Sequence, residues 1–383
     1  MQPLSRRSRR WFFVSFILIF SISVPIFAFY ATGYRLDFST PENRIVTVGG
    51  MYVSADIDSI EMFINDELVE DMRFFQSAAY IQNLPAGQHQ IHTQGLGVYT
   101  WVKSLPIYPR IVTTADSFNV PVRPQIRLVP EWETQVGETV LFTQATSTKF
   151  AFASTTNPRF FVATTTATTT FSRNLEYDFL RQQFASSAED KASLNATSTA
   201  TTTPFVFSTQ QPAQPVVDQP VLPPATSTVL GRSLRLDLID EEVFATYIGS
   251  ANNAPRNFCV RYQSATSTIA EYGEHVFVAL QAEFATSTLQ PTTGEPLELC
   301  RTRIRLDRKW QSVQDFDFLP GRADIVLMHL QDGVYAVEVD DRGWQNVQQL
   351  YPGYHLEMLV TGGQVFIKDD DYILEVLTEV ATL

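Results

Sequence analysis

The C-terminal third of the chain contains the stretch VQDFDFLPGRADIVLMHLQDGVYAVEVDDRG, which runs from Val313 to Gly343. It divides into strand-like runs of β-branched and aromatic residues, and the tightest turn between them is Gln331-Asp332-Gly333. An Asp-Gly step between apolar runs is a strong signal for a β-hairpin. A second meander follows, over His355–Val360, Val365–Lys368 and Tyr372–Leu377. The two meanders predict antiparallel sheets at this end of a mainly β chain.

Further strand-like runs precede the two meanders, at Leu234–Leu238, Val243–Ile248, Phe258–Tyr262, His275–Ala282 and Leu297–Leu306. Each meander has the pattern of a β-propeller blade. Residues 231–383 have room for about three or four blades of roughly 40 residues each, fewer than most closed propellers contain. We therefore expect a β-propeller-like domain over 231–383 that is either incomplete or completed by strands from residues 125–165.

Residues 44–122 contain short strand-like runs with a turn about every ten residues, a pattern typical of a small β-sandwich. The segments Leu84–Ile91, Gly97–Trp101 and Ile107–Pro109 resemble the second half of a PEGA domain, and Ser54–Glu67 resembles its first half. This chain has Asp56–Ser59 where that family has Pro-Glu-Gly-Ala. The resemblance implies a small sandwich of the kind found in bacterial surface proteins, with no shared catalytic residues.

Residues 1–10 form a basic tail that contains Arg6, Arg7, Arg9 and Arg10, and residues 11–31 that follow are uncharged. About 20 helical residues span roughly 30 Å, the thickness of the hydrocarbon core. The arginines predict a cytoplasmic N-terminus, so we expect a single-pass cell-membrane protein with an extracytoplasmic body. A cleaved signal peptide is the alternative, because Ala31-Thr32-Gly33 fits a small-x-small cleavage site.

Residues 141–230 are rich in Thr, Ser and Pro, which predicts a low-complexity linker. Within it Leu175, Phe179, Leu180 and Phe184 recur at helical spacing, so we expect a short helix near residues 174–194. The tetrapeptide Ala-Thr-Ser-Thr begins at Ala145, Ala196, Ala225, Ala265 and Ala285. It indicates either a hydroxyl-rich stalk open to O-glycosylation or loops that tolerate polar insertions, and the last two copies favour loops.

The two cysteines, Cys259 and Cys300, each lie in a strand-like run. Outside the cytoplasm such a pair is typical of a disulfide, and closing a loop of about 40 residues would stabilise the fold by roughly 4 kcal/mol. Two buried free thiols are the alternative. The formal net charge is −13, and the body without its N-terminal arginines is more acidic still. A body this acidic repels phosphate backbones, so we expect no nucleic-acid partner.

The chain lacks the motifs of nucleophilic, nucleotide-dependent and zinc-dependent catalysis. His89 and His92 are three residues apart on a predicted strand, which places them on opposite faces and argues against a metal pair. The runs Asp340-Asp341 and Asp369–Asp371 fit either solvated turns or a weak calcium site, and we expect no other cofactor. Trp310 and Trp344 fit either a glycan contact or packing between sheets.

These features predict a non-enzymatic envelope protein that is anchored in the membrane and presents a binding or scaffolding surface for cell-surface glycan or protein. The alternative is a sensor or assembly partner that binds another envelope protein. A polysaccharide hydrolase is the third hypothesis, because two carboxylates suffice for glycoside hydrolysis. A groove lined by Trp and acidic residues would favour glycan binding. A flat apolar patch would favour a protein partner, and a deep pocket with paired carboxylates would favour an enzyme.

Overall fold

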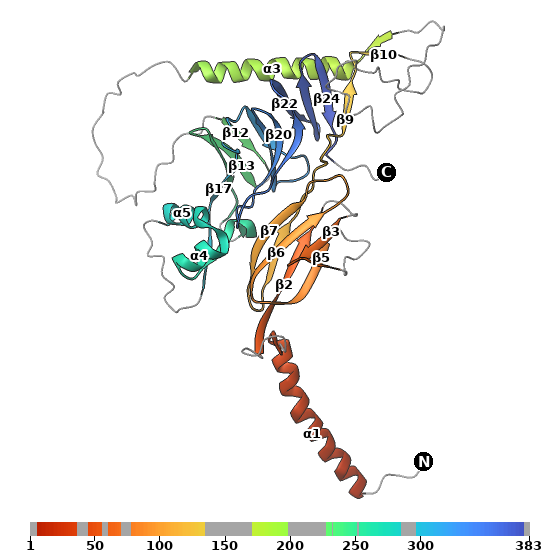
Figure 1. Cartoon of the computed structure of the whole chain (residues 1–383), viewed down its shortest axis with the longest axis vertical. Coiled ribbons are helices and arrows are strands. Elements are labelled where there is room, and N and C mark those ends of the chain that lie inside the picture. Colours follow the sequence, from red (N-terminus) through yellow and green to blue (C-terminus); the bar gives the residue numbers. More distant parts are fainter. Residues whose placement is uncertain are drawn as a thin grey trace, which may run out of the picture.

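The computed structural model describes residues 6–36, 45–55, 60–69, 78–134, 171–197, 227–231, 233–250, 253–284 and 296–378. Residues 1–5, the 56–59 segment and most of the predicted linker, 141–170 and 198–226, lie outside these ranges. The described protein is mainly β, which confirms the predicted fold class. It is elongated, with an N-terminal helix at one end, a sandwich in the middle and the C-terminal sheets at the other end (Figure 1).

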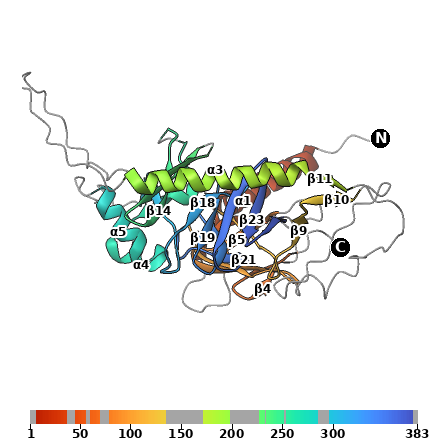
Figure 2. The same ribbon diagram turned by 90° about the horizontal axis from the view of Figure 1, so that it is seen from above.

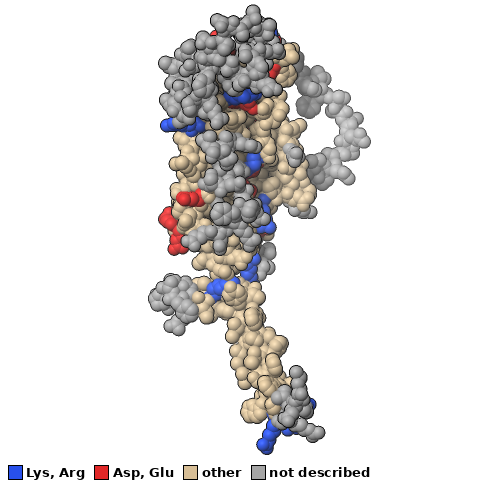
Figure 3. Space-filling view, turned by 90° about the vertical axis from the view of Figure 1, so that its right-hand side faces the viewer, with Lys and Arg blue, Asp and Glu red and all other residues tan. Residues whose placement is uncertain are grey.

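Helix α1 spans Arg6–Ala31 and contains Pro25. It is long and apolar enough to cross a membrane. The most apolar stretch of the span Arg7–Ala31 is not buried against the rest of the protein. Figure 3 shows an uncharged shaft that projects from the body, with Lys or Arg atoms at its free end. The sequence prediction of one N-terminal helix of membrane-spanning length is therefore confirmed.

Hydrogen bonds tie the end of α1 to the sandwich. Gly33 adopts a left-handed turn with φ +80°, and its carbonyl accepts a hydrogen bond from the Val48 amide at 2.8 Å. The Arg35 guanidinium donates to the Tyr30 carbonyl at 2.7 Å, and Arg110 donates to the Thr32 carbonyl at 2.8 Å. The end of α1 and the Ala31-Thr32-Gly33 segment, the alternative cleavage site, are thus bonded directly to the sandwich.

Two four-stranded sheets form the sandwich. The first consists of β1 (Tyr34–Leu36), β2 (Ile45–Ser54), β5 (Ala78–Pro85) and β8 (Val112–Asp116), which runs parallel to β2. The second consists of β4 (Glu67–Leu68), β3 (Glu61–Ile64), β6 (Gly87–Gln94) and β7 (Trp101–Ile107). Asn65 and Asp66 form the turn between β3 and β4, and both residues have the positive φ of a tight hairpin turn.

Three further four-stranded antiparallel sheets lie beyond the sandwich. The first consists of β12 (Ser227–Leu230), β13 (Leu234–Ile239), β14 (Glu242–Tyr247) and β17 (Arg303–Arg305). The second consists of β18 (Asp315–Phe318), β19 (Ile325–Leu330), β20 (Gly333–Glu338) and β21 (Val347–Pro352). The third consists of β22 (Leu356–Thr361), β23 (Gln364–Asp369), β24 (Tyr372–Val376) and β9 (Ile126–Val129). An early strand thus completes the last sheet, whereas closure of the three sheets into a propeller stays a prediction.

A hairpin with helices interrupts the first of these sheets between β14 and β17. It contains the short 3₁₀ helix η3 (Arg256–Phe258), β15 (Cys259–Tyr262), α4 (Ala265–Tyr272), α5 (Glu274–Glu283) and β16 (Leu297–Cys300). The strand predicted at His275–Ala282 is wrong, because α5 buries Val276 and Leu280, which are four residues apart on one helical face. The prediction of a loop at the Ala-Thr-Ser-Thr copy that begins at Ala265 is also wrong, because this copy forms the first turn of α4.

The sandwich and the second and third C-terminal sheets share one hydrophobic core, in which Trp101 and Leu105 belong to the same cluster as Leu327 and Ile367. Helix α3 (Leu175–Thr197) lies across the third sheet, as Figures 1 and 2 show. Its Phe184 is buried against that sheet. The helix expected near 174–194 is confirmed, and β11 (Phe171–Arg173), which pairs with β10 (Trp132–Thr134) in a two-stranded sheet, precedes it.

Candidate functional site

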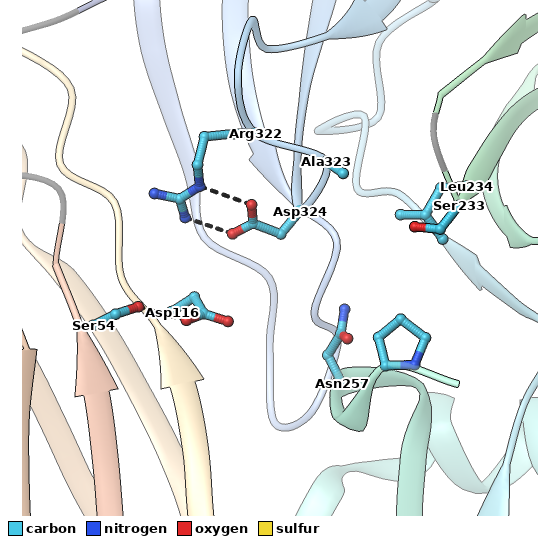
Figure 4. A pocket seen from close by; sticks show the side chains of 9 residues that line it. Ser54, Asp116, Ser233, Leu234, Asn257, Arg322, Ala323 and Asp324 are labelled. Atoms are coloured by element: carbon cyan, nitrogen blue, oxygen red, sulfur yellow. Dashed lines mark hydrogen bonds and ion pairs between the residues drawn. The ribbon is translucent and has the colours of Figure 1, made fainter. Parts of the chain in front are cut away.

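A cleft lies between the outer face of the first sandwich sheet and the C-terminal sheets. Its main cavity measures about 460 Å³. A smaller cavity of about 170 Å³ adjoins it, because the two share Asp116, Pro255, Asn257 and Asp324. The remaining residues that line the main cavity are Ser54, Ser233, Leu234, Arg322 and Ala323 (Figure 4).

One wall of the cleft comes from adjacent strands of the sandwich. The register of β2 and β8 places Ser54 beside Asp116, and the Ser54 hydroxyl donates to the Asp116 carboxylate at 2.5 Å. Val53 and Ala115 are buried in the sandwich core. Because side chains alternate between the faces of a strand, Ser54 and Asp116 point outward into the cleft.

The opposite wall comes from η3 and from the loop before β19. Arg322 and Asp324 form a two-point ion pair, with Nε–Oδ1 and Nη2–Oδ2 distances of 2.7 and 2.5 Å. The Asn257 amide donates to the Val339 carbonyl at 3.0 Å, which fixes its side chain. Figure 4 shows Asp116, Asn257 and Asp324 around one common space. Hydroxyl, carboxylate, amide and guanidinium groups therefore converge on the cavity.

A group of buried charges, which we term the ionic hub, comprises Lys103, Arg301, Glu338, Asp340, Asp341 and Arg342. Three of its members, Glu338, Asp340 and Arg342, line the smaller cavity. Lys103 on β7 is fully buried. Its ammonium donates to Glu338 at 3.0 Å and to the backbone carbonyls of Asp340 and Trp344 at 2.6 and 3.0 Å. Lys103 thereby joins the sandwich to the segment after β20.

Two arginines complete the hub. Arg342 pairs with Asp340 at 2.8 Å and donates to the Thr114 carbonyl at 3.0 Å, which connects the hub to β8. Arg301 pairs with Asp341 through both terminal nitrogens. The prediction that Asp340-Asp341 is a solvated turn is therefore wrong, because both carboxylates are buried and engaged by arginine.

Burial determines the electrostatics of the hub. Burial raises the pKa of Glu338, and the opposing effect of Lys103 does not cancel this rise. Burial alone would also raise the pKa of Asp340, but Arg342 and Lys103 lower it to about 2. The sequence analysis missed this hub, although a signal was present. Lys103 alternates with Trp101 and Leu105, so the strand pattern itself places a lysine on the buried face.

The predicted disulfide between Cys259 and Cys300 is confirmed, with an S–S distance of 2.01 Å. The two cysteines face each other in the β15–β16 register. The next residue, Arg301, is the one that pairs with Asp341. The disulfide therefore fixes the hairpin at the point where it contributes to the ionic hub.

The two tryptophans for which the sequence suggested a glycan contact do not line the cleft. Trp310 is 97% exposed, so packing between sheets is wrong for this residue. It occupies a turn with Lys309, and both residues have positive φ, an uncommon backbone for bulky side chains. Trp344 is 42% exposed. Neither indole lines either cavity, so a glycan contact at these residues stays a prediction.

The histidines of β6 have structural roles. His89 is buried and bonds the Asn65 side chain and the Pro85 carbonyl, both at 2.8 Å. His92 stacks on Phe63 with ring centroids 4.6 Å apart. Within the described ranges, no group of three or more His, Cys, Asp or Glu residues is placed to hold a metal ion.

Comparison with known proteins adds no relative to this picture. No protein-family model matches the chain, and no curated protein matches it. Fold and site together define a mainly β protein with an N-terminal apolar helix and a polar cleft between a sandwich and further sheets.

Proposed function

We propose that this chain is a non-enzymatic, membrane-anchored envelope protein that binds cell-surface glycan in the cleft between the sandwich and the C-terminal sheets. The polar lining of that cleft carries the proposal. Its size of about 460 Å³ is within the range of small-ligand sites. Sugar hydroxyls both donate and accept hydrogen bonds, and they suit a lining that offers Ser54, Asp116, Asn257 and Arg322.

The contacts around α1 support its retention as a membrane anchor. Arg35 and Arg110 bind backbone carbonyls at Tyr30 and Thr32, on both sides of Ala31. Cleavage after Gly33, the second small residue of the Ala31-Thr32-Gly33 site, would remove both of these carbonyls. The disulfide supports a location outside the cytoplasm, where such bonds persist. A PEGA-like sandwich is in keeping with both, and the arginines at the free end of α1 favour a cytoplasmic N-terminus.

The cleft lining contains four carboxylates, those of Asp116, Asp324, Glu338 and Asp340, and paired carboxylates are the feature that would suit a hydrolase. Lys103 binds Glu338, and Arg342 binds Asp340. Both oxygens of Asp324 already accept hydrogen bonds from Arg322. A general acid must instead present a proton to its substrate. The charge arrangement thus favours binding over catalysis, and we propose no enzymatic activity or cofactor.

A protein partner is the second candidate function, and Trp310 is the observation that favours it. Exposed tryptophans are enriched among the residues that dominate protein–protein binding energy. The turn that carries Trp310 holds it 97% exposed. An assembly role would use this turn, whereas glycan binding would use the cleft.

The test uses the full chain in lipid nanodiscs and insoluble wall polysaccharide from the source cell. We expect saturable retention that is lost in Asp116→Asn, with no sugar released. The matched control is Asp66→Asn, which removes the same charge at an exposed turn. Retention on a purified membrane protein that is lost in Trp310→Ala would favour the assembly role. Sugar release that depends on Asp116 would instead establish a hydrolase.

A further inference from the structure

The outer face of the sheet that carries Ser54 and Asp116 extends beyond the cleft. The registers place three rows of side chains across β5, β2 and β8. From the cleft outward these rows are Ala78–Ser54–Asp116, then Tyr80–Tyr52–Thr114, then Gln82–Gly50–Val112. Rows two residues apart on a strand lie roughly 6.5–7 Å apart. The cleft lining thus continues directly into a row that contains two tyrosines.

Both tyrosine rings are accessible on this face. Tyr52 is 40% exposed and Tyr80 is 51% exposed. Directly cross-strand Cβ atoms are about 4.5–5.5 Å apart, so the two phenols form one platform. A Cβ added at Gly50 would lie 3.6 Å from the Tyr80 ring, so this ring leans over the glycine. The Tyr80 ring therefore reaches from the middle row toward the third row on the same face of the sheet.

We propose that Tyr52 and Tyr80 form a stacking platform that extends the cleft into a binding site for a linear, uncharged polysaccharide. The proposal rests on glycan binding at the cleft and names the class of glycan. One sugar residue occupies the polar cavity at Ser54 and Asp116, and the next residues of the same chain lie on the tyrosines. Pyranose rings have apolar C–H faces and polar hydroxyl edges, which match aromatic faces and the neighbouring Thr114 hydroxyl.

The charge distribution selects an uncharged polymer. The two outer rows contain no ionisable group other than the two phenols. The only charge that the sheet itself contributes at the cleft is Asp116. The chain as a whole has a net charge of −13. The exposed Arg256 guanidinium, which donates to the Val112 carbonyl at 3.2 Å, is one cation beside the platform. A phosphate-rich or carboxylate-rich polymer carries many charges, so one cation does not compensate for its repulsion by the acidic body.

The test measures the affinity of the full chain in nanodiscs for β-1,4-linked oligomers of glucose and of N-acetylglucosamine, from monomer to hexamer, by calorimetry. Affinity should rise with length as successive residues reach the tyrosines. Tyr52→Ala and Tyr80→Ala should each weaken hexamer binding by roughly threefold to tenfold, the equivalent of one aromatic contact. Monomer binding should be unchanged in both variants. Tyr52→Phe should retain hexamer affinity, because the ring remains.

The control is Trp310→Ala, which removes an exposed ring that does not line the cleft. An unchanged melting temperature confirms that the tyrosine variants fold. If the hexamer binds, and Asp116→Asn weakens it while both tyrosine variants bind as the wild type does at every length, the platform is refuted and the cleft function stands. If the wild-type chain binds no oligomer of either series, the platform is refuted for these uncharged polymers, whereas the cleft function fails only if retention on wall polysaccharide is absent as well.

Discussion

Replacing Lys103 with methionine would remove the one cation that joins the sandwich to Glu338. The side chain is fully buried, and its three donors reach Glu338 and two backbone carbonyls at 2.6–3.0 Å. Methionine preserves the length of the side chain but leaves a buried carboxylate and two carbonyls without this partner. Breaking one side of a buried ion pair costs about 3–5 kcal/mol. We expect a loss of that size in urea unfolding of the full chain.

The penalty should depend on pH. Burial raises the pKa of Glu338, and Lys103 opposes that rise, so its removal raises the folded-state pKa further. A carboxyl group with a raised pKa stabilises the fold below the unfolded pKa and loses that contribution as the pH rises through the folded pKa. The Lys103→Met penalty should therefore be largest at neutral pH and should shrink as acid protonates Glu338.

A second substitution separates charge from packing. Lys103→Met combined with Glu338→Gln leaves no uncompensated charge at this contact, and we expect it to recover at least half of the loss. Asp66→Asn is the control, because it changes a charge on an exposed turn and should shift stability by less than about 0.5 kcal/mol. A single-variant loss below about 1 kcal/mol, or a double variant no more stable than the single, would refute the view that Lys103 compensates a buried carboxylate.

Three other changes probe the remaining supports of the fold. Replacing Cys259 and Cys300 together with serine should cost roughly 4 kcal/mol in urea unfolding, and an undiminished midpoint would show that the disulfide contributes no stability. Phe184→Ala should cost about 3–5 kcal/mol because the ring is buried between α3 and the third sheet; Phe179→Ala, at a residue that is 51% exposed, is the matched control and should stay within about 0.5 kcal/mol. A chelator should leave the melting temperature unchanged, and a fall would indicate a bound cation.

Much of the fold could be predicted because the relevant signals are local. The Asp-Gly step in Gln331-Asp332-Gly333 predicted a hairpin, and this step joins β19 to β20. The disulfide could be predicted because the chain contains two cysteines, and both lie in predicted strands of an extracytoplasmic domain. The error at His275–Ala282 has a local cause as well, because a short apolar run fits a strand or a helix equally until its buried face is known.

The cleft could not be predicted, because its residues are distant in sequence and are assembled by packing. Ser54 and Asp116 meet through a parallel pairing of β2 with β8, and no turn signal specifies such a pairing. Asn257 and Asp324 arrive from η3 and from the loop before β19. The sequence analysis selected Trp310 instead, because a residue type can be read directly from the sequence. A polar lining assembled from distant segments cannot be read in this way.

The cleft walls belong to different parts of the fold, yet the structure gives them little freedom to separate. A single hydrophobic core underlies the sandwich and two of the three C-terminal sheets. Arg342 holds the Thr114 carbonyl on one wall, and Lys103 holds the carbonyls of Asp340 and Trp344 behind the other. Opening the cleft would expose these buried charges without their partners, at several kcal/mol per pair. A preformed site pays little ordering entropy on binding, so the cleft should select its ligand by the fit of rigid walls rather than by closure around it.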